Sequence, residues 1–344
     1  MDKLKVVGNK LIDQHGRPRM LRGANVIDWE WKYSWRETPE FELRAIPVLC
    51  GDPGLAAPQT QGWGANLVQF AVHSGPILRT EQKYLNGLDD IVDACHEAGT
   101  FLMLSYRAPE PNTQMPPGIP EDAMNAMGIL ANRYVGQEGL LWGAAVEPHD
   151  ISWATLRPQL EKMVDVIRLH IPDAVVFCPG TQWARYVHWA LNDPVQRDNV
   201  VYKVDFYGSF ADADGSYKLA ATAETYPVIM GEFGAGGQTS LEDTKKLLDY
   251  WEAHGMGYCA WSFSDEGSPR LLRSKTTFEP STFGALLKPK LQEKYADSYP
   301  SEPLPPLPPE PPPVPVPTAK TYIITLGGMS LTFTTDIPIT IQEL

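Results

Sequence analysis

Short apolar runs alternate with amphipathic stretches from residue 21 to residue 263, and this alternation restricts the possible folds more than any other feature of the chain. Eight of the runs have the length and composition of buried strands. They cover residues 21–25, 66–72, 101–107, 141–146, 174–178, 200–207, 227–233 and 257–263. Strands that alternate with helices in this way indicate βα units and a parallel sheet.

Helical periodicity fills most of the intervals between these runs. In residues 81–98, for example, the apolar residues Ile91, Val92 and Cys95 lie on one side, and residues 156–170 and 240–254 also have a helical pattern. Eight strands with interleaved helices fit an α/β protein with one closed (β/α)8 barrel, the TIM barrel. A doubly wound open sheet is the competing architecture, but no glycine-rich phosphate loop follows the first run.

The sharpest change in composition comes at residues 300–317, where proline dominates. Such a run adopts a stiff, extended conformation, so we interpret residues 299–317 as a proline-rich linker. Beyond it, two alternating segments around Gly327 and Gly328 predict a β-hairpin. Because a lone hairpin is marginally stable in water, we expect this tail to pair with the main domain, another copy of the chain or a larger assembly. The chain thus divides into a barrel (1–298), the linker and a short β tail (318–344).

Charge and cysteine usage exclude several classes of partner. The chain has 29 basic and 42 acidic residues, a formal net charge of −13, whereas nucleic-acid binding requires a clustered basic face. No apolar stretch is long enough to span a bilayer, and residues 1–5 lack the apolar core of a signal peptide, so we expect no membrane partner. The widely spaced cysteines predict neither a zinc site nor a disulfide framework, but buried thiols. They are Cys50, Cys95, Cys178 and Cys259.

The catalytic candidates stand where apolar runs end, since active sites in such barrels are built from the C-terminal ends of the strands. The run at residues 141–146 is followed by Glu147, and the run that begins at Pro227 reaches Glu232. Both carboxylates would lie at the mouth of the barrel, on the fourth and seventh strands, across the lumen from each other. One strand-end glutamate is as readily explained by solvation or an ion pair, but the two together favour chemistry.

Two carboxylates in one cleft suit the cleavage of a glycosidic bond. One must stay protonated to donate a proton to the leaving oxygen, while the other stays ionised. A gap of about 5 to 5.5 Å between the groups gives retention of configuration, and about 6.5 to 9.5 Å gives inversion. The sequence sets no distance, so the stereochemistry stays open at this point.

The N-terminal segment VGNKLIDQHGRPRMLRGAN, residues 7–25, resembles the hairpin and first strand of glycoside hydrolase family 5, the cellulase family, and its wider clan. The resemblance continues through the Glu-Pro pair at residue 147, the aromatic pair that ends at Tyr207, the motif GEFG at residues 231–234 and Trp261. It leaves out the tail. It implies that Glu147 is the acid/base and Glu232 the nucleophile. It also implies that Tyr207 hydrogen-bonds the nucleophile and that Trp261 is the platform under the sugar.

Four positions depart from the pattern of that family. Val146 stands where an asparagine that binds the sugar 2-hydroxyl is usual, and Gln69 stands where a second-strand arginine usually keeps the nucleophile ionised. Arg107 and Asp205 each replace a usual histidine. Loss of the second-strand cation would raise the pKa of Glu232, and we expect Arg107 to restore a positive charge from the third strand.

Other residues near the expected mouth are candidates for substrate contacts. His73 and His149 would supply substitute polar contacts. Trp183 would line one side of the cleft, opposite an aromatic cluster that is equally explained by packing of a long loop. The cluster comprises Trp29, Trp31, Tyr33 and Trp35. In the first strand, Asn25 is expected near the mouth and Arg22 near the lumen, as a support for the carboxylates.

These observations predict a retaining glycoside hydrolase that acts on a β-linked oligosaccharide or polysaccharide without a cofactor or metal. By the resemblance, the substrate is a β-1,4-glucan or a β-mannan. The alternative is a catalytically weakened carbohydrate-binding or structural barrel, attached through its tail to a larger assembly. A metal-dependent hydrolase built on His73, His149 and Asp205 is open in principle, although the ligand spacing gives it no support. A glycan substrate and the linker favour an extracellular location, and the sequence leaves that choice open.

Overall fold

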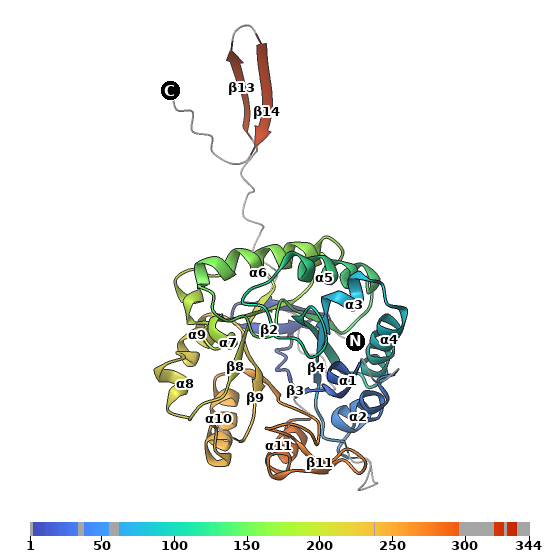
Figure 1. Cartoon of the computed structure of the whole chain (residues 1–344). Helices are drawn as coiled ribbons and strands as arrows, with labels where there is room; N and C mark the ends of the chain where they lie inside the picture. Colours follow the sequence, from blue (N-terminus) through green and yellow to red (C-terminus); the bar gives the residue numbers. More distant parts are fainter. Residues whose placement is uncertain are drawn as a thin grey trace. The chain divides into compact units, whose positions relative to one another are not determined.

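The computed structural model describes residues 3–33, 38–54, 62–236, 238–295, 320–326 and 329–335. Parallel strands close into a barrel in which each strand pairs with its neighbours in sequence and the last pairs with the first. They are β3 (Arg22–Asn25), β4 (Leu67–His73), β5 (Phe101–Ala108), β6 (Leu140–Gly143), β7 (Val176–Pro179), β8 (Val200–Phe206), β9 (Val228–Phe233) and β10 (Gly257–Ala260). The prediction of a (β/α)8 barrel is confirmed (Figure 1).

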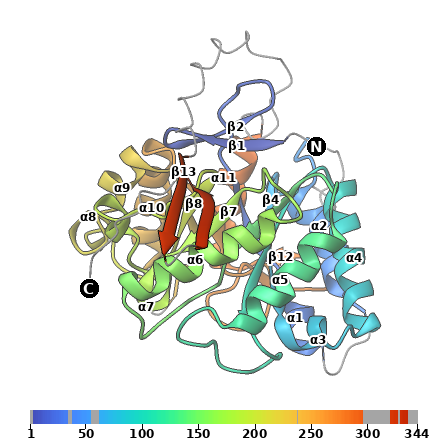
Figure 2. The same ribbon diagram turned by 90° about the horizontal axis from the view of Figure 1, so that it is seen from above.

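Helices surround the barrel, as Figures 1 and 2 show. The longer ones are α2 (Glu40–Cys50), α4 (Gln82–Glu97), α5 (Glu121–Arg133), α6 (Trp153–Arg168), α10 (Leu241–Ala253) and α11 (Thr282–Glu293). The shorter ones are α1 (Asp28–Lys32), α3 (Ser74–Leu78), α7 (Thr181–Ala184), the 3-10 helix η1 (His188–Leu191), α8 (Asp212–Gly215) and α9 (Leu219–Thr225). Serine side chains cap α6, α10 and α11 by accepting a backbone N–H of the first turn, which explains where these helices begin.

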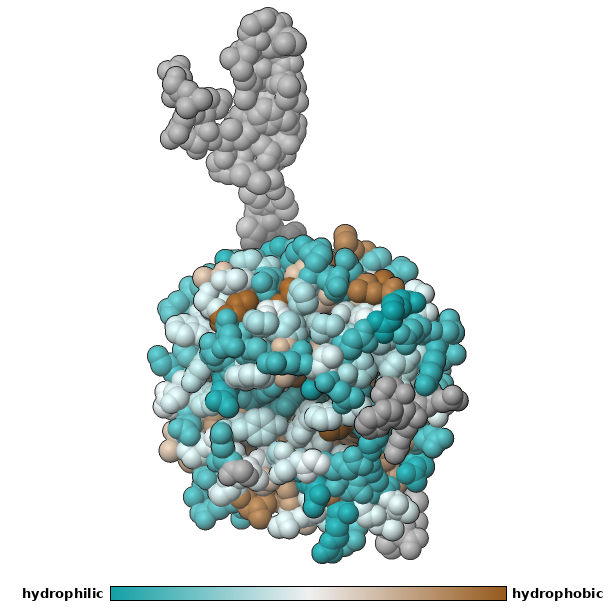
Figure 3. All heavy atoms as spheres, in the orientation of Figure 1, coloured by the Kyte–Doolittle hydropathy of each residue, from teal (hydrophilic) through white to brown (hydrophobic). Residues whose placement is uncertain are grey.

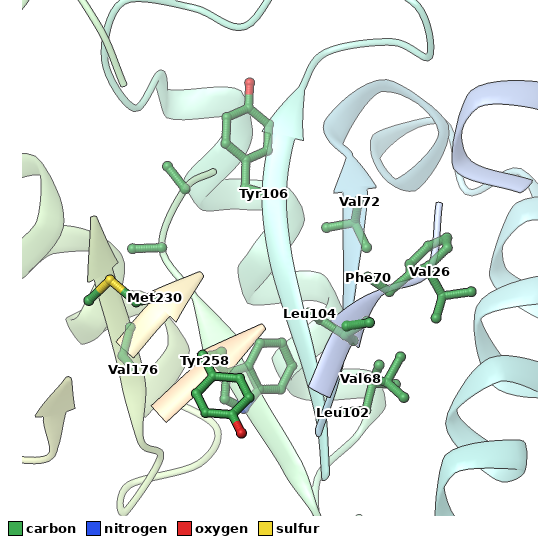
Figure 4. Close-up of a cluster of buried hydrophobic side chains, with 14 of the residues drawn as sticks. Val26, Val68, Phe70, Val72, Leu102, Leu104, Tyr106, Val176, Met230 and Tyr258 are labelled. Carbon is green, nitrogen blue, oxygen red and sulfur yellow. The ribbon is translucent and has the colours of Figure 1, made fainter. Parts of the chain in front are cut away.

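The core has two layers because side chains alternate along each barrel strand. One set points outward and packs against the helices; Val68, Phe70 and Leu104 belong to it (Figure 4). The other set points into the barrel, where Leu67, Met103 and neighbouring apolar residues fill the interior toward the N-terminal ends of the strands. The polar residues of the inward set lie farther along the strands, and this arrangement places them at the C-terminal end.

The fourth barrel strand is shorter than predicted. β6 ends at Gly143, so Glu147 lies beyond the regular strand and not at its last position. The segment nevertheless stays tied to the barrel, since Ala144 N donates to the oxygen of Phe177 at 2.9 Å and Val146 N donates to the oxygen of Tyr106 at 2.8 Å. Alternate hydrogen bonds to the two neighbouring strands therefore hold the residues that precede Glu147.

Two small antiparallel sheets accompany the barrel. β1 (Leu4–Val7) and β2 (Lys10–Asp13) form a hairpin whose residues Leu4 and Leu11 join the apolar interior of the barrel. β11 (Leu272–Ser274) pairs with β12 (Glu279–Pro280) after the last barrel strand. The face of the molecule shown in Figure 3 is mostly hydrophilic, with apolar residues in small separate patches.

The chain forms two compact units, residues 1–304 and 305–344. In the second unit β13 (Lys320–Leu326) pairs antiparallel with β14 (Met329–Thr335), at the position where a hairpin was expected. The predicted linker, residues 299–317, lies outside the described residues. All four cysteines are buried and unpaired, as expected. In the described ranges, no helix has both the length and the apolar character needed to cross a membrane.

Candidate active site

Three carboxylates converge at the C-terminal end of the barrel. Glu147 follows β6, Asp205 lies in β8 and Glu232 lies in β9. One carboxylate oxygen from each residue lies within 4.8 Å of the other two. The register of β8 and β9 shifts between Val204 and Asp205, and Asp205 therefore lies opposite Glu232. The two glutamates singled out in the sequence share one site with a third acid.

Lys203 belongs to the same site and was not among the predicted site residues. Its Nζ donates to Asp205 Oδ1 at 2.6 Å, to Asp205 Oδ2 at 2.7 Å and to the backbone oxygen of Val146 at 3.1 Å. Both side chains of this ion pair are fully buried. Lys203 and Asp205 alternate along β8 and so share its inward face, and Tyr207 follows directly after the strand. A lysine within an apolar strand, two residues before another charge, was the sequence signal for this pair.

Burial and mutual repulsion oppose the ionisation of all three acids. Burial raises the pKa of Glu147 to about 7, and the neighbouring charge of Asp205 adds to the effect. Burial also raises the pKa of Asp205 to about 6, although Lys203 acts in the opposite direction. The pKa of Glu232 is raised well above its usual value, first by burial and then by Asp205 and Glu147. Near neutral pH the cluster therefore retains protons, shared among its members.

The charge of Lys203 is favoured in spite of its burial. Burial tends to lower the pKa of the ammonium group, but the attraction of Asp205, followed by those of Glu232 and Glu147, outweighs this effect and raises the pKa. Lys203 is therefore a permanent cation among the three acids over the whole physiological pH range.

Tyr207, Trp261 and Asn25 lie around Glu232. The hydroxyl of Tyr207 donates to Glu232 Oε2 at 3.3 Å. Trp261 follows β10, and its backbone N–H donates to the oxygen of Phe233 at 2.9 Å, which holds it beside the strand that carries Glu232. Asn25 Nδ2 donates to the backbone oxygen of Gly231 at 3.0 Å, so this side chain supports β9 from inside the barrel.

Neither Gln69, which is uncharged, nor Arg107 places a positive charge in contact with the clustered carboxylates. Gln69 is buried, and neither its amide nitrogen nor its amide oxygen has a hydrogen-bond partner. Arg107 Nε instead lies 3.2 Å from Glu30 Oε1, and its guanidinium lies over the ring of Trp31 at 5.3 Å. The expectation that Arg107 replaces the missing charge beside Glu232 is wrong, because the buried carboxylate of Glu30 engages it; Lys203 is the cation that touches the acidic cluster.

The two histidines near the mouth do not form a metal site with Asp205. His73 Nδ1 lies 3.3 Å from the oxygen of Ala108 and its Nε2 lies 3.7 Å from Glu30, while burial lowers the pKa of His73 to about 3. The ring nitrogens of His149 contact Asp150 and the oxygen of Met115. Across the described part of the chain, only the three clustered acids have the spacing of a metal site, and Lys203 already neutralises one of them.

The aromatic residues separate into core and surface groups. Trp29 is fully buried and stacks with Phe70 and Tyr84, so packing explains it. Trp31 is 43% exposed and Trp183 is 36% exposed, and these two remain available to a ligand. The ring of Trp183 stacks on His149 at 4.1 Å, so His149 supports Trp183. Tyr33, like Trp29, is part of the core, and Trp35 lies outside the described residues.

Arg22 points away from the lumen. Its Nε and Nη2 donate to the two carboxylate oxygens of Glu252 on α10, at 2.6 and 2.7 Å. The expected support of the catalytic carboxylates by Arg22 is therefore wrong. Alternation along β3 explains the outcome, because Asn25 takes an inward position and Arg22, three residues earlier, takes an outward one.

Comparison with known families decides the class of the protein. The model of the cellulase family, glycosyl hydrolase family 5, matches residues 56–267, which is more than half of the chain. The chain belongs to glycosyl hydrolase family 5. The matched region of this family 5 chain contains Glu147, Asp205, Glu232 and Lys203, the four charged residues of the cluster.

Curated relatives of this family 5 chain include two endoglucanases. It is 26% identical over 287 residues to endoglucanase A of Butyrivibrio fibrisolvens, covering 77% of this chain and 62% of the relative. It is 22% identical over 299 residues to endoglucanase E-5 of Thermobifida fusca, covering 81% of this chain and 58% of the relative. The chain thus spans about three fifths of the length of these two relatives.

Solved structures agree with the barrel. The native β-glucanase SdGluc5_26A of Saccharophagus degradans superposes with a TM-score of 0.73 at 20% identity, over 86% of this chain and 94% of that one. The catalytic domain of Thermobifida fusca endoglucanase Cel5A superposes with a TM-score of 0.66 at 20% identity, over 84% of this chain and 97% of that one. At such identities the similarity establishes the fold.

Proposed function

We propose that this family 5 chain is a retaining glycoside hydrolase that cleaves a β-linked glucan through Glu147 and Glu232. The close approach of the carboxylates carries the proposal, since one oxygen of each glutamate lies within 4.8 Å of the other. This gap suits a nucleophile and an acid/base, which are about 5 to 5.5 Å apart in retaining enzymes. An inverting enzyme needs about 6.5 to 9.5 Å to admit the attacking water.

In this proposal Glu232 is the nucleophile and Glu147 the acid/base. A carboxylate oxygen of Glu232 bonds to the anomeric carbon as the glycosidic bond breaks, and the proton of Glu147 moves to the leaving oxygen. Water then attacks the glycosyl-enzyme, giving its proton to Glu147 and releasing Glu232. The hydrogen bond from Tyr207 favours the ionised form of Glu232 and so opposes burial, which raises the pKa of this group. A pKa of about 7 lets Glu147 hold a proton near neutrality.

A β-1,4-glucan is the substrate that the comparisons favour, with β-mannan as the second choice. The two curated relatives are endoglucanases, and one structure of the Saccharophagus degradans β-glucanase is a complex with cellotetraose. The accessible rings of Trp183 and Trp31 suit the flat apolar faces of such a chain. Partly exposed Trp261 lies next to the strand of Glu232, where a sugar at the cleavage point would stack.

A catalytically weakened, glycan-binding barrel is the second candidate. Two observations favour it: the side-chain amide of Gln69 has no partner, and the apolar side chain of Val146 precedes Glu147. An amide at the position of Val146 would strengthen its bond to the sugar 2-hydroxyl in the transition state, so its absence reduces turnover.

Release of reducing sugar from β-glucans, mannans and xylans tests the two candidates. The intact chain is compared with Glu232→Gln and Glu147→Gln, and Glu224→Gln serves as the matched control, because Glu224 is an exposed residue of α9. We expect cleavage of a β-glucan by the intact chain and by the control, and its loss in the two site variants. If all four proteins bind a glycan equally well and none cleaves it, the enzyme proposal is rejected and the glycan-binding barrel is accepted.

A further inference from the structure

Lys203 and its partner Asp205 are the charged residues of the site for which the proposed reaction has no role. The groups that face the cluster are Glu147 after β6, Lys203 and Asp205 on β8, Tyr207 after β8, Glu232 on β9 and Cys259 on β10. β4 contributes the neutral Gln69, and β3 contributes the neutral Asn25. Arg107 and Arg185 act on Glu147 more weakly than Lys203 does. In the described part of the chain, no other lysine or arginine forms an ion pair with these acids.

The ammonium of Lys203 is fixed in direction. Its three N–H groups match three acceptors, namely the two oxygens of Asp205 and the backbone oxygen of Val146. Val146 directly precedes Glu147, and Asp205 lies opposite Glu232 in the sheet. One cation therefore contacts the segment that carries Glu147 and the acid that lies opposite Glu232.

The neighbouring strand leaves space for this lysine. A Cβ atom at Gly231 would lie 2.2 Å from Lys203 Cε, 2.6 Å from Lys203 Cγ and 2.8 Å from Asp205 Oδ1. Gly231 precedes Glu232 and lies where the register of β8 and β9 shifts. The absence of a side chain at this position leaves room beside β9 for the long side chain of Lys203 within the acidic cluster.

We propose that Lys203, held in place by Asp205, is a positioning residue whose charge sets the pH range in which Glu232 is ionised while Glu147 stays protonated. The proposal deepens the proposed function and rests on it for the roles of the two glutamates. Its physical basis is that a fixed positive charge in a buried site favours the ionised form of every neighbouring carboxyl group. Asp205 is then the counterion that makes a lysine tolerable in the interior of the barrel.

The experiment compares Asp205→Asn with the double variant Lys203→Met/Asp205→Asn. Both proteins have the same neutral residue at position 205, and they differ only in the cation. In the single variant Lys203 keeps acceptors at Val146 and at the new amide oxygen. The double variant exchanges a buried ion pair for uncharged groups, a change that proteins often tolerate. If Asp205→Asn does not fold, Lys203→Arg/Asp205→Asn supplies the same charge and takes its place.

Titration of the glutamate carboxyl carbons by NMR, in protein labelled with carbon-13 glutamate, measures both groups. Glu147→Gln and Glu232→Gln assign the signals. We expect both midpoints to be higher in the double variant than in Asp205→Asn, by about one pH unit or more, as for a unit charge a few ångströms away. Both limbs of the pH profile of kcat/KM should move in the same direction. Equal midpoints in the two variants would show that Lys203 only fastens β8 to the Glu147 segment, and would overturn the proposal.

The readout separates this inference from the proposed function. The carboxyl titration needs no turnover, so a chain that cleaves no glycan but shows the expected shift would refute the enzyme and leave the role of Lys203 intact. Conversely, a chain that cleaves a β-glucan through Glu147 and Glu232, yet shows no shift between the variants, would refute the inference alone.

Discussion

At the scale of single residues, the site concentrates three acids and one cation in a largely buried volume. Asp205 is fully buried and Glu232 nearly so, whereas Glu147 is partly exposed. A partly exposed acid can exchange protons with solvent, and a buried neighbour bonded to Tyr207 is better suited to attack. The difference in exposure therefore agrees with the proposed division of roles.

The acid/base role predicts how Glu147→Gln depends on the leaving group. We expect kcat on a β-glucan to fall by roughly 10²- to 10⁴-fold, because the leaving sugar loses its proton donor. A dinitrophenyl glycoside needs no such proton, so its first step should stay fast. In the intact chain, activity on the glucan should decline as the pH rises above about 7, because Glu147 then loses its proton. A burst-phase measurement on both substrates checks the contrast; equal losses on both would contradict the assignment.

The raised pKa of Glu147 also predicts a pH-dependent stability. Its folded-state pKa of about 7 exceeds its usual value of 4.5, so the carboxyl group loses stabilising free energy as the pH rises from about 4.5 through 7. Glu147→Gln removes this loss. We expect the Tm of the variant to exceed that of the intact chain at pH 8 but not at pH 4. The corresponding gain in the free energy of unfolding at pH 8 is at most about 3 kcal/mol. Thermal melts at the two pH values measure it, and a gain of equal size at both would exclude titration as the cause.

At the scale of elements, the turn after β7 has an unusual backbone. Gln182, Trp183 and Ala184 all have positive φ angles, of 53°, 63° and 56°. Non-glycine residues rarely adopt this conformation, and each such residue carries a conformational penalty. The hydrogen bond from Trp183 N to the oxygen of Pro148, at 2.9 Å, and the stack on His149 hold the turn in place. The strained turn thus fixes an exposed ring next to the Glu147 segment.

This geometry predicts a binding role for Trp183. We expect Trp183→Ala to raise KM for long glucans about 3- to 10-fold with little change in kcat, since one stacking contact is worth about 0.5 to 1.5 kcal/mol in both ground and transition states. Trp183→Phe keeps a ring and should lose less. Steady-state kinetics on oligosaccharides of increasing length test the prediction; a fall in kcat on the shortest substrate would instead indicate that the turn positions Glu147.

At the scale of the whole molecule, the barrel and the tail are separate compact units. The tail contains a two-stranded hairpin, and two strands alone bury little apolar surface. We propose that residues 318–344 are stabilised by association with another copy of the chain, with residues 299–317 as the linker.

Truncation after residue 298 tests this proposal. We expect the truncated chain to keep its Tm and its activity on a soluble glucan, because the barrel core lies within residues 4–291. The full chain should sediment as an oligomer that the truncated chain does not form. A monomeric full chain would assign the tail to a different partner, and a lower Tm after truncation would show that it packs on the barrel.

Much of the architecture was determined by the sequence alone. The alternation of apolar runs and helices predicted all the barrel strands, since a strand buried on both faces requires continuous apolar sequence. The ends of two runs identified Glu147 and Glu232, because the C-terminal ends of parallel strands must meet at one rim of a barrel. The predictions depended only on residues close together in the chain, and local patterns carry that information.

Only the tertiary structure decided which side chains touch. The distance between the glutamates, the outward direction of Arg22 and the pairing of Arg107 with Glu30 all depend on strand alternation combined with the register between strands. Lys203 shows the reason most clearly. Its place among the acids requires an inward position on β8, a counterion two residues later and the missing side chain of Gly231 on the next strand. Contacts between distant parts of the chain fix these conditions, and no local sequence pattern contains them.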